Sequence, residues 1–270
     1  MVVRVINNIF VRKCFNPCLL LIQKYTICMV SKNQKKLIKS LYQKKYRKQH
    51  GLFVAEGKKV INELLEEGLR LHSLFAFEDV FDIDFSEKYI VTEEELKQIS
   101  FLATPQIALA IFYIPDSSKI EERGLVLVLD DIRDPGNLGT IIRLCDWFGV
   151  KDLVCSIQTV DCYNPKVIQA TMGSIARVNI SYIDLKRFLM AKTKDVKVYG
   201  TFMEGRSVYK EQLSENAILI MGNEANGISE DIQNLVEDKI TIPQFGKDQK
   251  TESLNVATAT AIILSEFRRS

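Results

Sequence analysis

Short apolar runs rich in β-branched residues recur through the second half of the chain, at LVLVL, DLVCS, KVYGTF, AILIM and KITI. Runs of this length and composition are typical of strands buried on both faces of a parallel sheet, and helical segments separate several of them. The pattern predicts an α/β domain in which helices cover a parallel sheet. In such folds ligands bind at the carboxyl ends of the strands, because helix amino termini point unpaired N–H groups there.

The chain is long enough for two compact domains, since it has 270 residues of which 47% are hydrophobic and domains cluster near roughly 100–150 residues. We predict a small α/β domain at 31–115, a polar linker at 116–124 and the parallel-sheet domain at 125–270. In the small domain, apolar residues at helical spacing predict a first helix, which a strand-like LFVAEG follows. A second helix is predicted over Lys58–Glu67. The apolar positions of that first helix are Leu37, Ile38, Leu41 and Tyr42.

Positive charge is concentrated near the amino terminus. No Asp or Glu precedes Glu56, while Lys and Arg recur from Arg4 to Lys48, so the net charge of only +2 combines a basic arm with an acidic body. This distribution favours a polyanionic partner. A solvated, charged helix is the alternative that a lysine run alone would indicate.

Residues 1–30 are basic and apolar, but they contain neither an uncharged run long enough to span a bilayer nor a small-residue cleavage site for secretion. We predict a loose extension that is not part of the fold, with an organellar presequence as the alternative. The six cysteines lack C-x-x-C spacing, and two histidines complete no zinc motif. We therefore predict reduced structural thiols, no bound metal, no membrane partner and a cytoplasmic protein.

The stretch DDIRDPGNLG follows the first strand-like run of the larger domain and precedes a helix. Pro135 and Gly136 predict a turn, Asn137 predicts a helix cap, and Gly139 predicts a close approach of backbone segments. The stretch is neither a G-x-G-x-x-G fingerprint nor a P-loop. Arg143 lies off the apolar stripe of the helix that follows, so periodicity alone predicts a solvated arginine.

Two further predicted strands are followed by polar loops. After AILIM and Gly222 come Asn223 and Glu224, an amide and a carboxylate where a site at this edge would need them. After KITI come Pro243, a polar loop and Ser253, which we predict to cap a long apolar helix. Each pattern on its own also fits an ordinary turn or an ordinary capped helix.

Taken in order, these stretches resemble the three motifs of the SpoU family of RNA ribose 2′-O-methyltransferases, in the SPOUT or α/β-knot superfamily. The first is Asn137–Arg143, the second is Gly222–Gly227, and the third combines Ile242-Pro243 with Ser253–Val256. NPKVIQATMGSIARV is also similar to the segment between the first two family motifs. The resemblance spans Leu125–Ser270, and residues 31–115 more loosely resemble the family's amino-terminal substrate-binding domain.

The resemblance implies S-adenosylmethionine as the methyl donor, structured RNA as the substrate, a homodimer and a carboxy-terminal trefoil knot, which general topology rules count as rare. It favours ribosomal RNA over transfer RNA. The loop after Pro243 looks longer than in the family, so two cofactor assignments are aligned across an insertion. The cofactor contacts implied by position are Thr201, Gly222, Ile242 and Leu254. The implied catalytic residues are Asn137, Arg143, Glu224, Ser253 and Asn255.

The implied reaction displaces a sulfonium methyl group by a ribose hydroxyl, which must also lose its proton. The family assigns Arg143 a part in activating the hydroxyl, but a guanidinium with a pKa above about 12 is a poor base. We expect Arg143 instead to organise the ribose-phosphate by forked hydrogen bonds. We expect Glu224 to orient neighbouring donors or take up the proton, and Ser253 to hold the nucleophile.

Several alternatives stay open at this point. A transfer-RNA ribose methyltransferase, an RNA base methyltransferase of the same superfamily and a non-catalytic RNA-binding protein would share these features. A nicotinamide-dependent dehydrogenase would share the sheet but lacks its glycine fingerprint. For the homodimer, we expect the carboxy-terminal helix to contribute to the interface, because its apolar face would otherwise be exposed. Its apolar positions are Val256, Ile262, Ile263 and Phe267.

Overall fold

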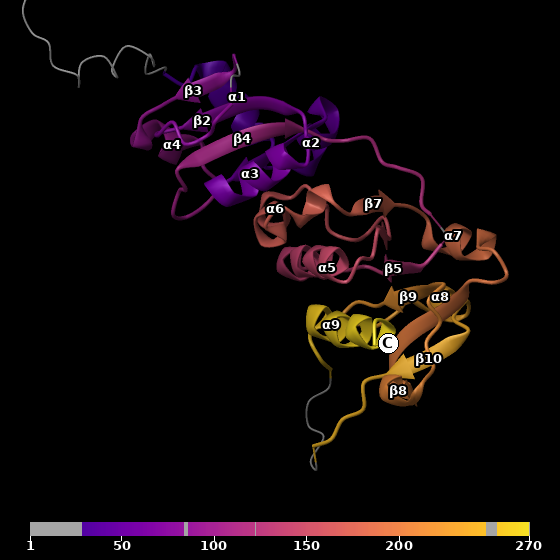
Figure 1. The fold of residues 1–270 in the computed structure, drawn as a ribbon. Helices are drawn as coiled ribbons and strands as arrows, with labels where there is room; N and C mark the ends of the chain where they lie inside the picture. Colours follow the sequence, from indigo (N-terminus) through magenta and orange to yellow (C-terminus); the bar gives the residue numbers. More distant parts are fainter. Residues whose placement is uncertain (1–28, 84–85, 122, 247–252, 270) are drawn as a thin grey trace, which may run out of the picture.

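The computed structural model describes residues 29–83, 86–121, 123–246 and 253–269 (Figure 1). The extension predicted over residues 1–30 therefore lies, but for its last two residues, outside the described part of the chain. Two sheets organise the described residues, and each has helices packed on it.

The amino-terminal sheet has four strands in the order β1-β4-β2-β3, with β4 antiparallel to both neighbours and β2 parallel to β3. Its strands are β1 (Leu52–Glu56), β2 (Leu71–Ala76), β3 (Lys88–Ile90) and β4 (Ala108–Tyr113). Its helices are α1 (Lys32–Ser40), α2 (Lys44–His50), α3 (Lys58–Glu66) and α4 (Glu93–Ile99). The strand predicted at LFVAEG and the helix after it are confirmed as β1 and α3.

The basic segment predicted as one helix is two, because α1 ends at Ser40 and α2 begins at Lys44. The buried guanidinium of Arg47 explains the break: it donates to the main-chain oxygens of Leu41 and Tyr42, at 2.8 and 2.7 Å. These hydrogen bonds supply partners for two carbonyls that the break leaves outside a helix. Tyr42, expected on the apolar stripe, is exposed instead.

The carboxy-terminal sheet has six strands in the order β10-β8-β9-β5-β6-β7, and every neighbouring pair is parallel. The strands are β5 (Leu125–Leu129), β6 (Asp152–Cys155), β7 (Asn179–Tyr182), β8 (Lys197–Ser207), β9 (Ala217–Met221) and β10 (Asp238–Thr241). The predicted parallel sheet is confirmed. Sequence patterning did not find β7, an edge strand whose polar residues alternate with only two apolar positions.

Helices cover both faces of this sheet, as the fully buried strands β5 and β9 require. The odd-numbered leucines of β5 face a core that includes α5 and α9, while Val126 and Val128 face α7 and α8. The helices are α5 (Pro135–Trp147), α6 (Pro165–Thr171), α7 (Leu185–Ala191), α8 (Glu230–Gln233) and α9 (Val256–Phe267), with 3₁₀ turns η1 (Ser174–Ala176) and η2 (Val208–Lys210). Among the described residues, no helix is long and apolar enough to cross a membrane.

The expectation that the apolar positions of α9 form a dimer interface is wrong for most of them. Val256, Ile263 and Phe267 are buried within the chain, where α9 packs on α5. Only Ile262 is partly exposed. The predicted exposed face does not exist because α9 itself covers the sheet.

Three cysteines lie among the described residues, and all are buried free thiols: Cys145, Cys155 and Cys162. Burial in apolar surroundings, with the nearby Asp161 charge adding to it, raises the pKa of Cys162 to about 12. Such a thiol stays protonated and unreactive at neutral pH. The other cysteines, Cys14, Cys18 and Cys28, lie outside the described residues.

The two sheets are joined through α6, which packs against β1. The Arg47 side chain, only 2% exposed, reaches from α2 to Asp161, with Nε 2.9 Å from the carboxylate oxygen. The rings of Phe53 and Tyr163 meet beside this ion pair, with their centroids 4.9 Å apart. A second ion-pair group links Arg177 to Glu63 on α3 and to Glu67 directly after it.

Replacing Arg47 by alanine should lower the free energy of unfolding by about 3–5 kcal/mol, because it leaves a largely buried carboxylate and two carbonyls without their partner. Denaturant titration measures the effect. Lys186→Ala, which removes an exposed ion pair with Asp231, is the control and should change stability by no more than about 0.5 kcal/mol. Equal, small losses in both variants would show that the Arg47 pair does not hold the sheets together.

Candidate active site

A cavity of about 1230 Å³ opens where the middle of β8 and the loops after β9 and β10 meet α9. The structure brings Thr201, Gly222, Ile242 and Leu254, all four residues implied for the cofactor, into its lining. Two of the implied catalytic residues, Glu224 and Ser253, also line it. Segments more than fifty residues apart in the sequence are thus gathered at one place.

The loop that follows β9 is a tight turn held by its own main chain. Asn223 and Gly227 exchange two backbone hydrogen bonds of 3.0 and 2.8 Å. The Asn223 side chain accepts from Ala225 N at 2.8 Å and from Asn226 N at 3.3 Å. A Cβ on Gly222 would lie 2.3 Å from the Gly227 carbonyl carbon, so only glycine fits there.

Three of the implied catalytic residues form one hydrogen-bonded chain, although they come from three separate segments: the first turn of α5, the loop after β9 and the cap of α9. The Asn137 side-chain nitrogen donates to a carboxylate oxygen of Glu224. The Asn255 side-chain nitrogen donates to Asn137 Oδ1 at 2.8 Å. Both ends of the Asn137 amide are therefore occupied, which fixes its orientation and holds the Glu224 carboxylate at the wall of the cavity.

Two helix caps differ from the predictions. Asp134, and not Asn137, caps α5, accepting from Asn137 N at 2.8 Å. Pro135 explains this, since proline is favoured at the first helical position and places the cap one residue before it. Asn255, and not Ser253, caps α9, accepting from the main chain of Ala257 and Thr258. Asn137 is thereby free to bind Glu224.

The close approach predicted at Gly139 is confirmed, because a Cβ there would lie 2.4 Å from Ala170 Cβ on α6. Arg143 is exposed on α5, on the same face as Thr140 and Trp147. It does not line the cavity, and among the described residues it has no hydrogen-bond or ion-pair partner. Of the five implied catalytic residues, Arg143 is the one that this chain alone does not bring to the site.

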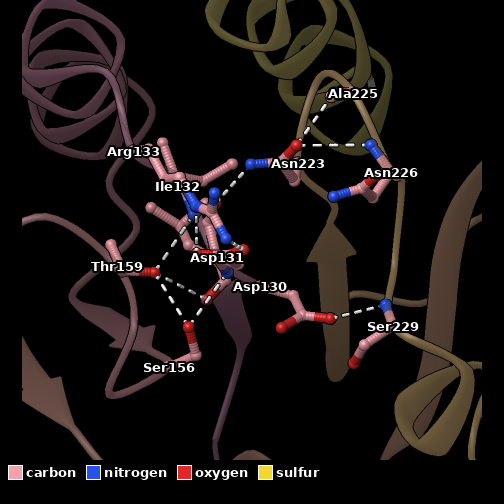
Figure 2. A network of polar contacts seen from close by, with 11 residues as sticks. Asp130, Asp131, Ile132, Arg133, Ser156, Thr159, Asn223, Ala225, Asn226 and Ser229 are labelled. Carbon is pink, nitrogen blue, oxygen red and sulfur yellow. Dashed lines mark hydrogen bonds and ion pairs between the residues drawn. The ribbon is translucent and has the colours of Figure 1, made fainter.

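Sequence reasoning missed a polar network beside the site, which Figure 2 shows. Asp130 and Asp131, directly after β5, contact the loop after β9 through Ser229 and Asn223. On the other side Asp131 N donates to Ser156 Oγ at 2.9 Å. The paired acids in DDIRDPGNLG were visible in the sequence, but their partners lie up to 99 positions away.

No group of three or more His, Cys, Asp or Glu side chains with the arrangement of a metal site occurs among the described residues. The absence of a bound metal stays a prediction. The polar groups that line the cavity include main-chain groups, side-chain amides and hydroxyls, and the carboxylates of Glu204 and Glu224, a set that suits an organic ligand with polar and apolar parts.

A parallel α/β sheet with its site at the carboxyl edge defines a class of ligand-binding α/β proteins, and comparisons with known proteins define the family within it. Residues 124–265 match the SpoU rRNA Methylase family. Residues 32–110 match the MRM3-like substrate binding domain. The chain belongs to the SpoU rRNA methylase family.

Three of its relatives match along nearly their whole length. The chain is 33% identical over 250 residues to the 23S rRNA (guanosine(2553)-2′-O)-methyltransferase RlmP of Bacillus subtilis, covering 88% of this chain and 97% of RlmP. An RNA methyltransferase of the TrmH family from Porphyromonas gingivalis superposes with a TM-score of 0.81 and 36% identity, covering 89% of this chain and 99% of that one. The AdoMet-bound rRNA methyltransferase from Sinorhizobium meliloti superposes with a TM-score of 0.80 and 29% identity, covering 91% and 97%.

These matches confirm the family resemblance and the α/β-knot fold class with a substrate-binding domain before it. They also confirm the methyltransferase class of enzyme. The nicotinamide-dependent dehydrogenase is thereby excluded. The roles of the individual site residues and the exact domain bounds stay predictions.

Proposed function

We propose that this chain transfers a methyl group from S-adenosylmethionine to a ribose 2′-hydroxyl of ribosomal RNA. The observation that carries the proposal is the hydrogen-bonded chain of Asn137, Glu224 and Asn255 beside a cavity lined by the implied cofactor residues. RlmP, which acts on a guanosine 2′-O position of 23S rRNA by its name, supports ribosomal RNA as the substrate.

The cavity fits S-adenosylmethionine in both size and chemistry. Apolar Ile242 and Leu254 suit the adenosine, and the main chain around Gly222 offers polar groups. When bound, S-adenosylmethionine supplies a methyl group activated by a positively charged sulfur. The volume of about 1230 Å³ exceeds the roughly 300–1,000 Å³ of most small-molecule pockets, which leaves room for the end of a second substrate.

Glu224 is the group that we assign to the hydroxyl proton. The ribose hydroxyl must give up its proton when it is methylated, and Glu224, as a carboxylate at the cavity, would accept that proton. Asn137 holds that carboxylate in place and is itself oriented by Asn255, and Ser253 adds a hydroxyl to the cavity lining. Fixing reactants in an attack geometry can contribute roughly 7–11 kcal/mol, so orientation is the main task of these residues.

We infer that the chain acts as a homodimer through the exposed face of α5. Trp147, the one tryptophan of the sequence, is 85% exposed on that face, together with Thr140 and Arg143. Large exposed aromatic side chains are typical of protein interfaces. Since Arg143 does not line the cavity of its own chain, we assign it to the cavity of the second copy, where its guanidinium forks onto the RNA phosphate.

Trp147→Glu should convert the dimer to a monomer, because a charge would be buried in the contact. Light scattering at micromolar concentration measures the mass, and Met190→Glu, at another exposed apolar position on α7, is the matched control that should leave it unchanged. A monomeric wild-type protein, or a Trp147→Glu dimer, would contradict the proposed interface.

Arg143→Ala should bind S-adenosylmethionine normally but lose most methyl transfer, and Arg143→Lys should not restore it, because lysine lacks the planar fork. Stability should change by no more than about 0.5 kcal/mol, since the side chain is exposed. Mixing Arg143→Ala with Glu224→Gln subunits should recover activity, because some shared sites then hold both residues. If the mixture stays inactive, Arg143 works within its own chain.

The RNA is expected to bind at α2, where exposed Lys44, Lys45 and Lys48 are not matched by acidic side chains of the same helix. Replacing all three by glutamine should weaken rRNA binding and reduce the salt slope of log K by about 2–3, because each phosphate contact releases counterions. Lys186→Gln with Lys194→Gln is the charge control and should leave the slope unchanged. Deleting residues 1–115 is the poorer test, because it exposes the buried face of α6.

Incubation with labelled S-adenosylmethionine tests the reaction itself, using ribosomal and transfer RNA as separate substrates. Ribose methylation makes the adjacent linkage resistant to alkali, so label should appear in an alkali-resistant dinucleotide from rRNA. Label in a mononucleotide would indicate a base methyltransferase, and label in tRNA would indicate that tRNA is the substrate. Cofactor binding without any transfer would indicate a non-catalytic protein. The cytoplasmic location stays a prediction that fractionation of cells can test.

A further inference from the structure

The loop between β9 and α8 forms one wall of the cavity, and two consecutive residues after β5 hold it from outside (Figure 2). Asp130 is 6% exposed, and its Oδ2 accepts a hydrogen bond of 2.7 Å from Ser229 N, at the far end of the loop. The carbonyl oxygen of Asp131 accepts a hydrogen bond of 2.6 Å from the Asn223 side chain, at the near end. Glu224 lies between these two attachment points.

Asp131 has an uncommon backbone conformation for a residue with a side chain, because its φ angle is +58°. In this left-handed geometry the main chain of Asp131 forms hydrogen bonds on two sides. Its carbonyl oxygen accepts from the Asn223 side chain in the β9 loop, and its N–H donates to Ser156. Asp tolerates the conformation better than most residues, and β-branched residues tolerate it poorly. Residues held this way cluster at functional sites.

The surroundings of Asp131 fix this conformation from several sides. Ser156 and Thr159 are buried, their hydroxyl oxygens lie 3.0 Å apart, and Ile132 N donates to Thr159 Oγ1 at 3.3 Å. On the solvent side Arg133, whose side chain is 71% exposed, forks onto the Asp131 carboxylate with bonds of 3.0 and 2.7 Å. The buried contacts involve the main chain of Asp131, whereas the exposed contact involves its side chain.

We infer that Asp130 and Asp131 are positioning residues for the proposed methyl transfer. They fix both ends of the loop Asn223–Ser229, and so set the place of the Glu224 carboxylate and of the cofactor wall. Asp130 acts through its carboxylate and Asp131 through its main-chain carbonyl. The inference rests on the proposed function, because it assigns these residues to the binding of S-adenosylmethionine and to the orientation of Glu224.

The first test compares Asp130 with a buried carboxylate elsewhere in the same sheet. Asp152 on β6 is 4% exposed, accepts a hydrogen bond of 2.6 Å from Asn179, and does not line the cavity. Calorimetric titration gives the Kd of S-adenosylmethionine, and single-turnover assays give the rate of transfer. Asp130→Ala should raise the Kd at least tenfold and lower the rate, whereas Asp152→Ala should lose stability but keep both values.

Asp130→Asn should stay within threefold of wild type in both measurements, because its amide oxygen still accepts from Ser229 N. An unchanged Kd and rate in folded Asp130→Ala would overturn the inference. So would an equal rise of the Kd in Asp152→Ala, since the effect would then reflect general loss of stability. A wild-type protein that does not bind S-adenosylmethionine would instead overturn the proposed function.

The second test separates the main chain of Asp131 from its side chain, and it stands even if Asp130→Ala does not fold. Asp131→Gly keeps the left-handed backbone and should bind S-adenosylmethionine within threefold of wild type. Asp131→Val disfavours that backbone, displaces the carbonyl and should raise the Kd at least tenfold. Equal losses in Asp131→Gly and Asp131→Val would show that the carboxylate matters and would overturn the assignment to the carbonyl.

Discussion

The parallel pairing of β5 with β9 at the centre of the larger sheet is the constraint on which the site depends. Leu125 pairs with Ala217 and Leu129 with Met221, so the two strands end in register. Asp130 N extends the ladder by donating to Met221 O at 3.0 Å. The two loops that follow these strands therefore start side by side, although about ninety residues separate them in the sequence.

This register brings together segments that have no unusual structure of their own, so that they form a single site. The segment after β5 contacts the loop after β9 three times, through Asp130, Asp131 and Asn137. Asn255 at the start of α9 adds the third loop to the same chain of hydrogen bonds. Because α9 packs on α5 and α6 packs on β1, the cap of α9 and the amino-terminal domain are held against the same rigid core.

Much of the fold followed from patterns that the sequence states locally. Short runs of β-branched residues correctly predicted the buried strands. The polar residues after AILIM and KITI predicted the loops that line the cavity. The features that could not be predicted from the sequence depend on contacts with residues far away in the chain. The break between α1 and α2 depends on where Arg47 reaches, and the burial of Ile263 depends on which face of the sheet α9 covers. Asp131 adopts its conformation because Ser156 and Asn223 bind its main chain.

Asn137 at the start of α5 and Glu224 in the loop after β9 act as one unit in the proposed methyl transfer, and a double-mutant cycle on these two residues measures their coupling. Single-turnover transfer to rRNA would be measured for Asn137→Ala, Glu224→Ala and the double variant. We expect the double variant to be scarcely slower than the slower single variant, with a coupling of about 1–3 kcal/mol between the two residues. Losses that simply add would show that the two side chains act independently and that their hydrogen bond has no part in the transfer.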